Sequence, residues 1–280
     1  MAGKLWLVPT PIGNLGDISA RAAEILSAVD FIAAEDTLVT VKLLNHLGLK
    51  KPMTAYHRHN RDTAGPAILR RLEEGGTCAL VTDAGTPAVS DPGEDVVALC
   101  AAAGVKVEAI PGPCALTVAL SVSGLPTARF VFEGFLPMNK KNRRARLDAL
   151  EREERTMIFY EAPHKLRATL DELAAVLGPD RPVAVCRELT KLHEEVIRTT
   201  LGEAVSRYAQ QEPRGEFVLV AAGCPPQADL GDEDAALARA AELRQEGLPL
   251  KAAAAQAAEE FGVKKRTLYN RALRGGTGAF

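Results

Sequence analysis

Short apolar runs alternate with stretches of helical periodicity from the start of the chain. In the first half, the predicted strands are 5–8, 31–34, 79–82 and 105–110, and the predicted helices are 19–29, 37–47, 62–74 and 93–103. A regular alternation of strand and helix predicts a largely parallel sheet whose faces are covered by helices. Right-handed crossovers follow from strand twist.

The second half of the chain also combines short apolar strands with helices, but its sequence differs from that of the first half. Its predicted strands are 130–135, 157–161, 183–189, 196–200 and 217–221, and its predicted helices are 143–153, 163–176 and 202–210. After it, Pro, Gly and acidic residues cluster in CPPQADLGDED, which is typical of a linker. Three more helices are predicted at 233–246, 250–260 and 264–274. We therefore predict α/β domains at 1–124 and 125–223, a linker at 224–232 and a helical domain at 233–280.

Composition narrows the class of protein. The chain is 47% hydrophobic with a formal net charge of -2, so any contact with nucleic acid must come from local basic patches. Its five cysteines are widely spaced without a CxxC, which argues against a disulfide framework or a zinc site and favours small apolar residues in a reducing cytoplasm. The sequence shows no signal-peptide pattern and no apolar run of about 18 residues, so we expect a cytoplasmic protein without a membrane span.

Three loops rich in glycine and proline each follow a predicted strand and enter a helix. They are PTPIGNLGD at 9–17, TDAGTPAVSDPG at 82–93 and IPGPCA at 110–115. Ligands of open α/β sheets bind at this edge, and glycine lets them approach the backbone closely. Neither GxGxxG nor a P-loop is present, so ordinary dinucleotide or nucleoside-triphosphate binding is not indicated. A tight capped turn remains an alternative for the first loop, and a plain helix entry for the third.

A series of motifs points to a known family. The segments TPIGNLGDIS, EDT, TDAGTPAVSDPG, IPGPCA, FEGFLP, FYEAPHKL, RELTK and GEFVLV occur in this order within 5–222. Together they resemble the small-subunit rRNA cytidine 2′-O-methyltransferase family of the tetrapyrrole-methylase superfamily, and the helical tail resembles the family's C-terminal domain. Leu38 departs from the pattern, since arginine is commoner after EDT, and so does the pair His164-Lys165; both changes concern substrate contacts.

The resemblance implies two α/β domains of the tetrapyrrole-methylase type with S-adenosylmethionine in the cleft between them, plus a small helix-turn-helix-like domain. It also implies a homodimer that methylates a cytidine in the decoding region of small-subunit (16S) rRNA, either as naked rRNA or as the assembled small ribosomal subunit. Carried over residue by residue, the resemblance places cofactor contacts at Pro11, Asp83, Ala84, Gly85, Ala88, Cys114, Ala115, Tyr160, Glu161 and Leu189.

Methyl transfer to a hydroxyl needs a proton acceptor but no metal. Asp36 directly follows the second predicted strand and is the first candidate, although an aspartate there is also typical of a helix N-cap. Glu188 and Lys191 are the second candidates, and Lys191 is alternatively a phosphate contact or a solvated lysine. His57 and His59 lack a third ligand at a recognisable spacing, so no metal site is predicted.

Two basic segments are candidates for RNA contact. The first contains Lys140, Lys141, Arg143, Arg144 and Arg146, and such a patch makes binding sensitive to salt. Its alternative is a solvated helix start. The second is the tail, where Ala258 and Gly262 fit a helix-turn-helix and Lys264, Lys265 and Arg266 begin the last helix. A three-helix packing module without a nucleic-acid role is the alternative there.

Two other functions remain open at this stage. A related enzyme that methylates carbon in a tetrapyrrole would share the cofactor loops, although a small macrocycle needs neither the basic segment nor the tail. A non-enzymatic helix-turn-helix regulator would use the tail but leaves the two α/β domains unexplained. The identity of the proton acceptor, the state of the substrate and the dimer interface are not readable from the sequence.

Overall fold

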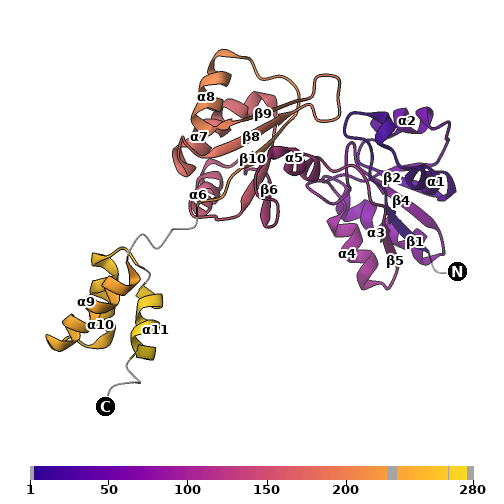
Figure 1. Cartoon of the computed structure of the whole chain (residues 1–280). Helices are drawn as coiled ribbons and strands as arrows, with labels where there is room; N and C mark the ends of the chain where they lie inside the picture. The colour runs from indigo at the N-terminus through magenta and orange to yellow at the C-terminus, as the bar shows by residue number, and fades with distance from the viewer. Residues whose placement is uncertain (1–2, 226–231, 264, 276–280) are drawn as a thin grey trace. The chain divides into compact units, whose positions relative to one another are not determined.

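The computed structural model describes residues 3–225, 232–263 and 265–275. The N-terminal part of the chain forms a parallel five-stranded sheet of order β3-β2-β4-β1-β5 (Figure 1). The strands are β1 (Lys4–Leu7), β2 (Phe31–Ala34), β3 (Met53–Ala55), β4 (Thr77–Val81) and β5 (Lys106–Ala109).

Helices cover both faces of this sheet. On one face, α1 (Ala20–Ala28) and α2 (Thr37–His46) bury side chains such as Leu26 and Leu44 against Ile32. On the other face, α3 (Arg61–Glu73) and α4 (Glu94–Ala102) bury theirs against neighbours that include Phe31. Every residue of β2 is buried, as is usual for a parallel strand between two helix layers.

The strand order creates a switch point between β1 and β4. The chain leaves β1 toward α1 and β2 on one side, whereas it leaves β4 toward α4 and β5 on the other. The loops after these two neighbouring strands therefore diverge and open a crevice, the usual ligand-binding position in open α/β sheets. Two backbone hydrogen bonds join the loops across the crevice: Thr10 N–H donates to the Gly85 carbonyl at 2.9 Å, and Gly85 N–H donates to the Thr10 carbonyl at 3.0 Å.

A second five-stranded sheet, of order β6-β7-β10-β8-β9, follows in the chain. β6 and β7 are parallel and the other pairs are antiparallel. The strands are β6 (Phe130–Phe135), β7 (Thr156–Glu161), β8 (Pro182–Arg187), β9 (Glu195–Thr200) and β10 (Phe217–Ala221).

Both faces of the second sheet are buried, and alternate residues of each strand serve different helices. Helices α6 (Lys140–Leu150), α7 (Leu166–Leu177) and α8 (Leu201–Gln210) share one core with Phe159 and Leu219. The opposite face, with Ile158 and Val218, packs on α5 (Ala115–Ser123), which follows the third glycine- and proline-rich loop. Figure 1 shows α5 beside this second sheet. The first loop reaches the same core through Ile12.

The C-terminal unit, residues 224–280, separates from residues 1–223 by its internal contacts and is described by itself. It consists of α9 (Glu233–Gln245), α10 (Leu250–Glu260) and α11 (Lys265–Gly275). Alanines such as Ala240, Ala253 and Ala257 fill its core, so the helices pack closely. Gly262 lies at φ +64 between α10 and α11, a conformation that glycine adopts without strain.

The predicted fold class is confirmed: two α/β sheets with flanking helices precede a three-helix unit. The sequence pattern missed β3, which is only three residues long and pairs with β2 alone at the sheet edge. The predicted domain boundary at residue 124 stays a prediction. Among the described residues, none of the helices combines the length and the apolar character that a membrane crossing needs.

The cap of α1 gives a test of these local contacts. The Ser19 hydroxyl accepts a hydrogen bond from Ala22 N–H at 3.1 Å at the helix N-terminus. We expect Ser19→Ala to lower the free energy of unfolding by about 1 kcal/mol, because the amide loses its partner. Ser121→Ala is the control, since the Ser121 hydroxyl only donates to the Thr117 carbonyl within α5 and its loss leaves no amide unpaired. Equal effects of the two variants in urea unfolding would contradict the assignment.

Candidate functional site

A cavity of about 500 Å³ lies within residues 1–223, at the carboxyl ends of β2, β4 and β7 and at the amino end of β10. Its lining comes from all three glycine- and proline-rich loops and from the second sheet. The lining residues are Ile12, Glu35, Asp83, Ala84, Gly85, Thr86, Val89, Ser90, Asp91, Cys114, Ala115, Phe135, Tyr160, Glu161, Ala162, Pro163, Leu189, Glu216, Phe217 and Val218.

Backbone strain concentrates around this cavity. Among the described residues, the non-glycine positions with positive φ are Ala88, Ser90, Glu188 and Thr190. The first pair belongs to the 82–93 loop and the second to the segment after β8. Such conformations cost free energy and persist where the surrounding structure holds them, which is common at ligand sites. We interpret both loops as shaped for a ligand.

The two strained loops are held by contacts from other elements. Arg58, which follows β3, donates through Nη2 to the Ser90 carbonyl at 3.1 Å. A Cβ on Gly134 would lie 2.8 Å from Ser90 Oγ, so the bulge of β6 approaches Ser90 closely at a glycine. Lys191 lies against Gly13, where a Cβ would stand 2.3 Å from Lys191 Cγ. The first loop and the loop after β8 are therefore in close contact.

Carboxylates give the cavity its electrostatic character. Burial, followed by repulsion from Glu35, raises the pKa of Asp91 to about 6. The pKa of Asp83 is also raised, mainly by burial and then by the nearby charges of Glu35 and Asp36. Thr82 donates from its hydroxyl to Glu35 Oε2 at 2.6 Å. Clustered carboxylates favour a cationic ligand, whose charge relieves their mutual repulsion.

Tyr160 and Glu161 are neighbours at the end of β7 but point to opposite faces of the sheet. The Tyr160 hydroxyl accepts a hydrogen bond from Leu116 N–H at 3.1 Å at the start of α5. Its ring also packs edge-on against Phe135, with the centroids 5.6 Å apart. Glu161 points toward α7, where Thr169 donates to Glu161 Oε2 at 2.5 Å. Successive side chains of a strand point to opposite faces of the sheet, so Tyr160 contacts α5 and Glu161 contacts α7, although both residues line the cavity.

The structure brings together most of the cofactor residues that the resemblance implies. Asp83, Ala84, Gly85, Cys114, Ala115, Tyr160, Glu161 and Leu189 line the cavity. Pro11 and Ala88 do not appear in the lining, although their neighbours Ile12 and Val89 do. The sequence did not single out Glu35, Asp91 or Glu216 as site residues, although all three line the cavity. Glu35 and Asp91 stand within the EDT and TDAGTPAVSDPG motifs, whereas Glu216 has only its place before β10 as a signal.

The candidate proton acceptors from the sequence lie outside the lining. Asp36 caps α2, because its Oδ1 accepts from Leu38 N–H at 2.7 Å. Lys191 donates to Glu188 Oε1 at 2.8 Å and to Glu216 Oε2 at 2.9 Å. Desolvation lowers the pKa of Lys191, but its bonds to these two carboxylates outweigh it and raise the pKa, so the side chain is a cation rather than a base.

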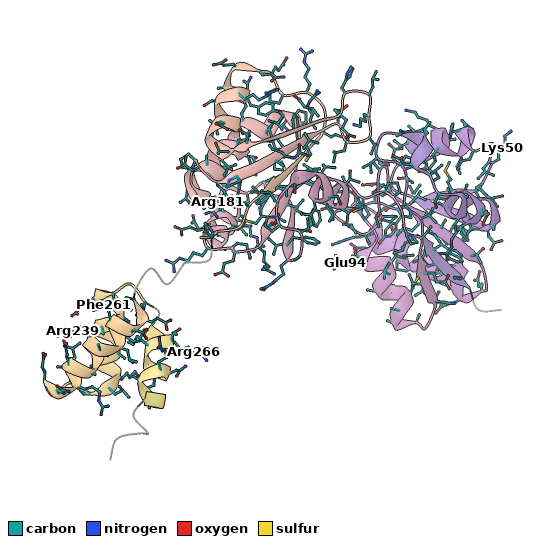
Figure 2. The ribbon with its side chains drawn as sticks, viewed as in Figure 1. Lys50, Glu94, Arg181, Arg239, Phe261 and Arg266 are labelled. Carbon is teal, nitrogen blue, oxygen red and sulfur yellow. The ribbon has the colours of Figure 1, made fainter. Side chains whose placement is uncertain are left out.

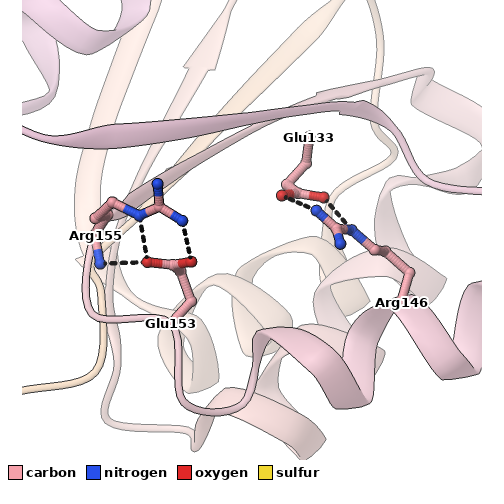
Figure 3. Close-up of polar contacts among 4 residues, drawn as sticks. All are labelled: Glu133, Arg146, Glu153 and Arg155. Carbon is pink, nitrogen blue, oxygen red and sulfur yellow. Dashed lines mark hydrogen bonds and ion pairs between the residues drawn. The ribbon is translucent and has the colours of Figure 1, made fainter.

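The basic stretch on α6 divides into inward and outward residues. Lys140 and Lys141 are exposed, and no ion pair is recorded for either within the described residues. Arg144 pairs with Asp148, and Arg146 forms two 2.6 Å bonds to Glu133 (Figure 3). Arg143 turns inward to Glu172 and Thr169.

The tail helix α11 carries exposed Lys265 and Arg266, the latter labelled in Figure 2. Lys264 lies outside the described residues. Arg271 reaches back to Glu233 and Asp234 of α9 at 2.6 and 2.8 Å, so it ties the helices together. Lys265 and Arg266 at the start of α11 are therefore available for a partner.

Comparison with known families agrees with the fold and the site. Residues 4–205 match the family described as Tetrapyrrole (Corrin/Porphyrin) Methylases, and residues 230–275 match the RsmI C-terminal HTH domain. Two solved structures share the fold at low identity. A uroporphyrin-III-C-methyltransferase from Thermus thermophilus is 20% identical with a TM-score of 0.55, covering 78% of this chain and 94% of that one. A diphthine synthase is 14% identical with a TM-score of 0.59, covering 78% and 90%.

Closer relatives extend over nearly the whole chain. The Ribosomal RNA small subunit methyltransferase I of Escherichia coli O157:H7 is 49% identical, covering 97% of this chain and 95% of that protein. The protein of the same name from a Synechocystis strain is 47% identical, covering 97% and 98%. On this similarity, the chain belongs to the ribosomal RNA small subunit methyltransferase I family, within the tetrapyrrole methylases.

Proposed function

We propose that this protein transfers a methyl group from S-adenosylmethionine to the ribose 2′-hydroxyl of a cytidine in the decoding region of small-subunit rRNA. The observation that carries the proposal is the full-length similarity, 49% and 47% identical, to proteins named Ribosomal RNA small subunit methyltransferase I. The choice of a cytidine and of its 2′-oxygen rests on the motifs TPIGNLGDIS and TDAGTPAVSDPG taken together.

The cavity residues fit S-adenosylmethionine. This molecule has a cationic sulfonium, an ammonium group and an adenosine with apolar faces. The cavity volume of about 500 Å³ is within the usual range for small-ligand sites. Glu35, Asp83 and Asp91 complement the positive charge, Phe135 and Tyr160 offer aromatic surface, and Gly85 leaves the backbone open to close approach. We assign the cofactor to the ten positions that the resemblance implies, with Pro11 and Ala88 shaping their loops.

The reaction requires a ribose hydroxyl to be held in line with the donor and to lose its proton as the new bond forms. When bound, S-adenosylmethionine supplies an activated methyl group. We propose Asp91 as the proton acceptor, because it lines the cavity and its raised pKa of about 6 makes it a better base than an ordinary aspartate at neutral pH. Asp36 remains the alternative.

The other polar candidates have positioning roles in this scheme. The Glu188–Lys191–Glu216 group fixes the strained loop after β8 against Gly13. In an alternative role, Lys191 binds a substrate phosphate after exchanging one of its carboxylate partners. Lys140, Lys141, Lys265 and Arg266 are the proposed RNA contacts, and Lys264 is added from the sequence.

The assembly and location of the protein complete the proposal. We adopt the homodimer that the resemblance implies. The small ribosomal subunit, the proposed partner, is assembled in the bacterial cytoplasm, where we place this protein.

Label transfer tests the substrate. With radiolabelled S-adenosylmethionine, we expect methylation of naked small-subunit rRNA or of assembled small subunits, and none of a free tetrapyrrole. Mapping of 2′-O-methyl groups then identifies the nucleotide. Label on the tetrapyrrole would support the carbon methyltransferase instead. No transfer to any substrate, together with sequence-specific duplex binding, would support the regulator.

The pH dependence of methyl transfer tests Asp91. A base must be deprotonated, so kcat/KM for S-adenosylmethionine should fall as pH drops through about 6, the raised pKa of this carboxyl. The bound cationic donor favours the carboxylate form of Asp91. The acid limb of the kcat profile, where kcat falls with pH, should therefore lie at lower pH than the acid limb of kcat/KM. Asp91→Asn should lower kcat by at least about a hundred-fold, within the range ascribed to general base catalysis, and should abolish this limb.

Asp36→Asn is the matched comparison for Asp91→Asn. An asparagine still caps a helix, so this variant keeps α2 intact while removing the charge. If Asp36→Asn abolishes the limb and Asp91→Asn retains it, Asp36 is the acceptor and the assignment to Asp91 fails. Calorimetric binding of S-adenosylmethionine to both variants separates a lost base from a lost binding site.

Salt dependence tests the RNA surface on α6. The double variant Lys140→Gln/Lys141→Gln should reduce the slope of log affinity against log salt by roughly one to two, since each lysine neutralises one phosphate. Arg155→Gln is the control because Arg155 is occupied by Glu153 (Figure 3). An unchanged slope in the double variant would remove α6 from the RNA surface.

A further inference from the structure

Arg143 differs from the other basic residues of α6 in its burial. Its side chain is 13% exposed, whereas that of Arg144 is 69% and that of Arg146 is 49% exposed. A guanidinium at this depth is held by partners rather than by water. The sequence groups Arg143 with the RNA-facing lysines, but the structure turns it toward the protein interior.

The partners of Arg143 form a chain of contacts. Its Nε donates to Glu172 Oε2 at 2.6 Å, and its Nη2 donates to Thr169 Oγ1 at 2.6 Å. Thr169 is fully buried, and its hydroxyl donates in turn to Glu161 Oε2 at 2.5 Å. A hydroxyl accepts one bond and donates another, so both contacts are compatible. Arg143 Nη2 also lies 4.0 Å from Glu161 Oε2.

Glu161 connects this chain of contacts to the cavity. Its side chain is 3% exposed, and the residue lines the cavity at the end of β7. Its Oε1 accepts from Ala162 N–H at 2.9 Å, which leaves Oε2 for Thr169 and Arg143. A carboxylate buried to this degree needs compensating hydrogen bonds and a cation nearby. Removal of the cation therefore favours a different rotamer of Glu161.

We infer that Arg143 is a positioning residue of the methyl-donor site, holding the Glu161 carboxylate at the cavity through Thr169. This inference rests on the proposed function, because the cationic donor is the ligand that an oriented carboxylate serves. It separates Arg143 from Lys140 and Lys141 on the same helix: the lysines face a polyanion, and the arginine supports the binding of a cation.

The test compares two variants on one helix. Arg143→Gln and Arg146→Gln each remove one positive charge from α6. Each also removes the cation beside a buried carboxylate, which is Glu161 for Arg143 and Glu133, with a side chain 4% exposed, for Arg146. Glu133 is absent from the cavity lining. We expect Arg143→Gln to weaken S-adenosylmethionine binding about ten-fold by calorimetry, equivalent to about 1.4 kcal/mol. Arg146→Gln should stay within about two-fold.

Kinetics distinguish positioning from general damage to the fold. In Arg143→Gln, KM for S-adenosylmethionine should rise about ten-fold, with kcat at saturating donor within two-fold of wild type and RNA affinity unchanged. The double variant Arg143→Gln/Glu161→Gln should be less impaired than the sum of its single changes, because the two residues act as a unit. Weaker RNA binding with unchanged donor affinity in Arg143→Gln would overturn the inference and restore Arg143 to the RNA surface.

A second variant keeps the test valid if Arg143→Gln does not fold. Thr169→Val removes the bridging hydroxyl and leaves the Arg143–Glu172 pair in place. It should also weaken donor binding, and donor affinity equal to wild type would overturn the inference. Wild-type protein that takes up no S-adenosylmethionine would overturn the proposed function and the inference together. If the wild-type protein binds the donor and Arg143→Gln and Thr169→Val bind it with the same affinity as wild type, the inference alone is overturned.

Discussion

The switch point between β1 and β4 is the constraint on which the rest of the structure depends. The two strands are parallel neighbours, yet their crossovers leave toward opposite faces of the sheet. Their following loops cannot pack on each other along their length. Thr10 joins them through two backbone hydrogen bonds with Gly85 and through its hydroxyl, which donates to the Thr82 carbonyl. The crevice that results is closed by Tyr160 and Glu161 of the second sheet and by Leu189, which follows β8.

The cavity is electrostatically unfavourable when only the protein is considered. Glu35, Asp83 and Asp91 bring negative charge into a partly desolvated space. The raised pKa values of the two aspartates reflect burial first and their mutual repulsion with Glu35 second. Strain at Ala88 and Ser90 adds a second local cost. The well-packed sheets around the cavity compensate for both. A cationic ligand that relieves the repulsion gains affinity from a site already held in shape, without further reorganisation of the loops.

Recognition of RNA by a chain with a net charge of -2 requires separation of charges within the molecule. Most arginines of the described surface near α6 are occupied: Arg146 by Glu133, Arg155 by Glu153 and Arg144 by Asp148. These pairs cancel charge locally, so the lysines at the start of α6 stand out although they are few. The tail follows the same pattern, because Arg271 binds α9 while Lys265 and Arg266 remain exposed on α11.

The sequence by itself determined the order of strands and helices, the three glycine- and proline-rich loops and the family, because these depend on local periodicity and on motifs that are contiguous in the chain. It did not reveal the edge strand β3, whose three residues are too few for a periodic signal. It also grouped Arg143 with Lys140 and Lys141, and it favoured Asp36 over Glu35 and Asp91. The tertiary structure decided where β3 pairs and which partners these side chains have, because a side chain's burial and partners depend on residues distant in sequence, such as Thr169 for Arg143 and Glu35 for Asp91.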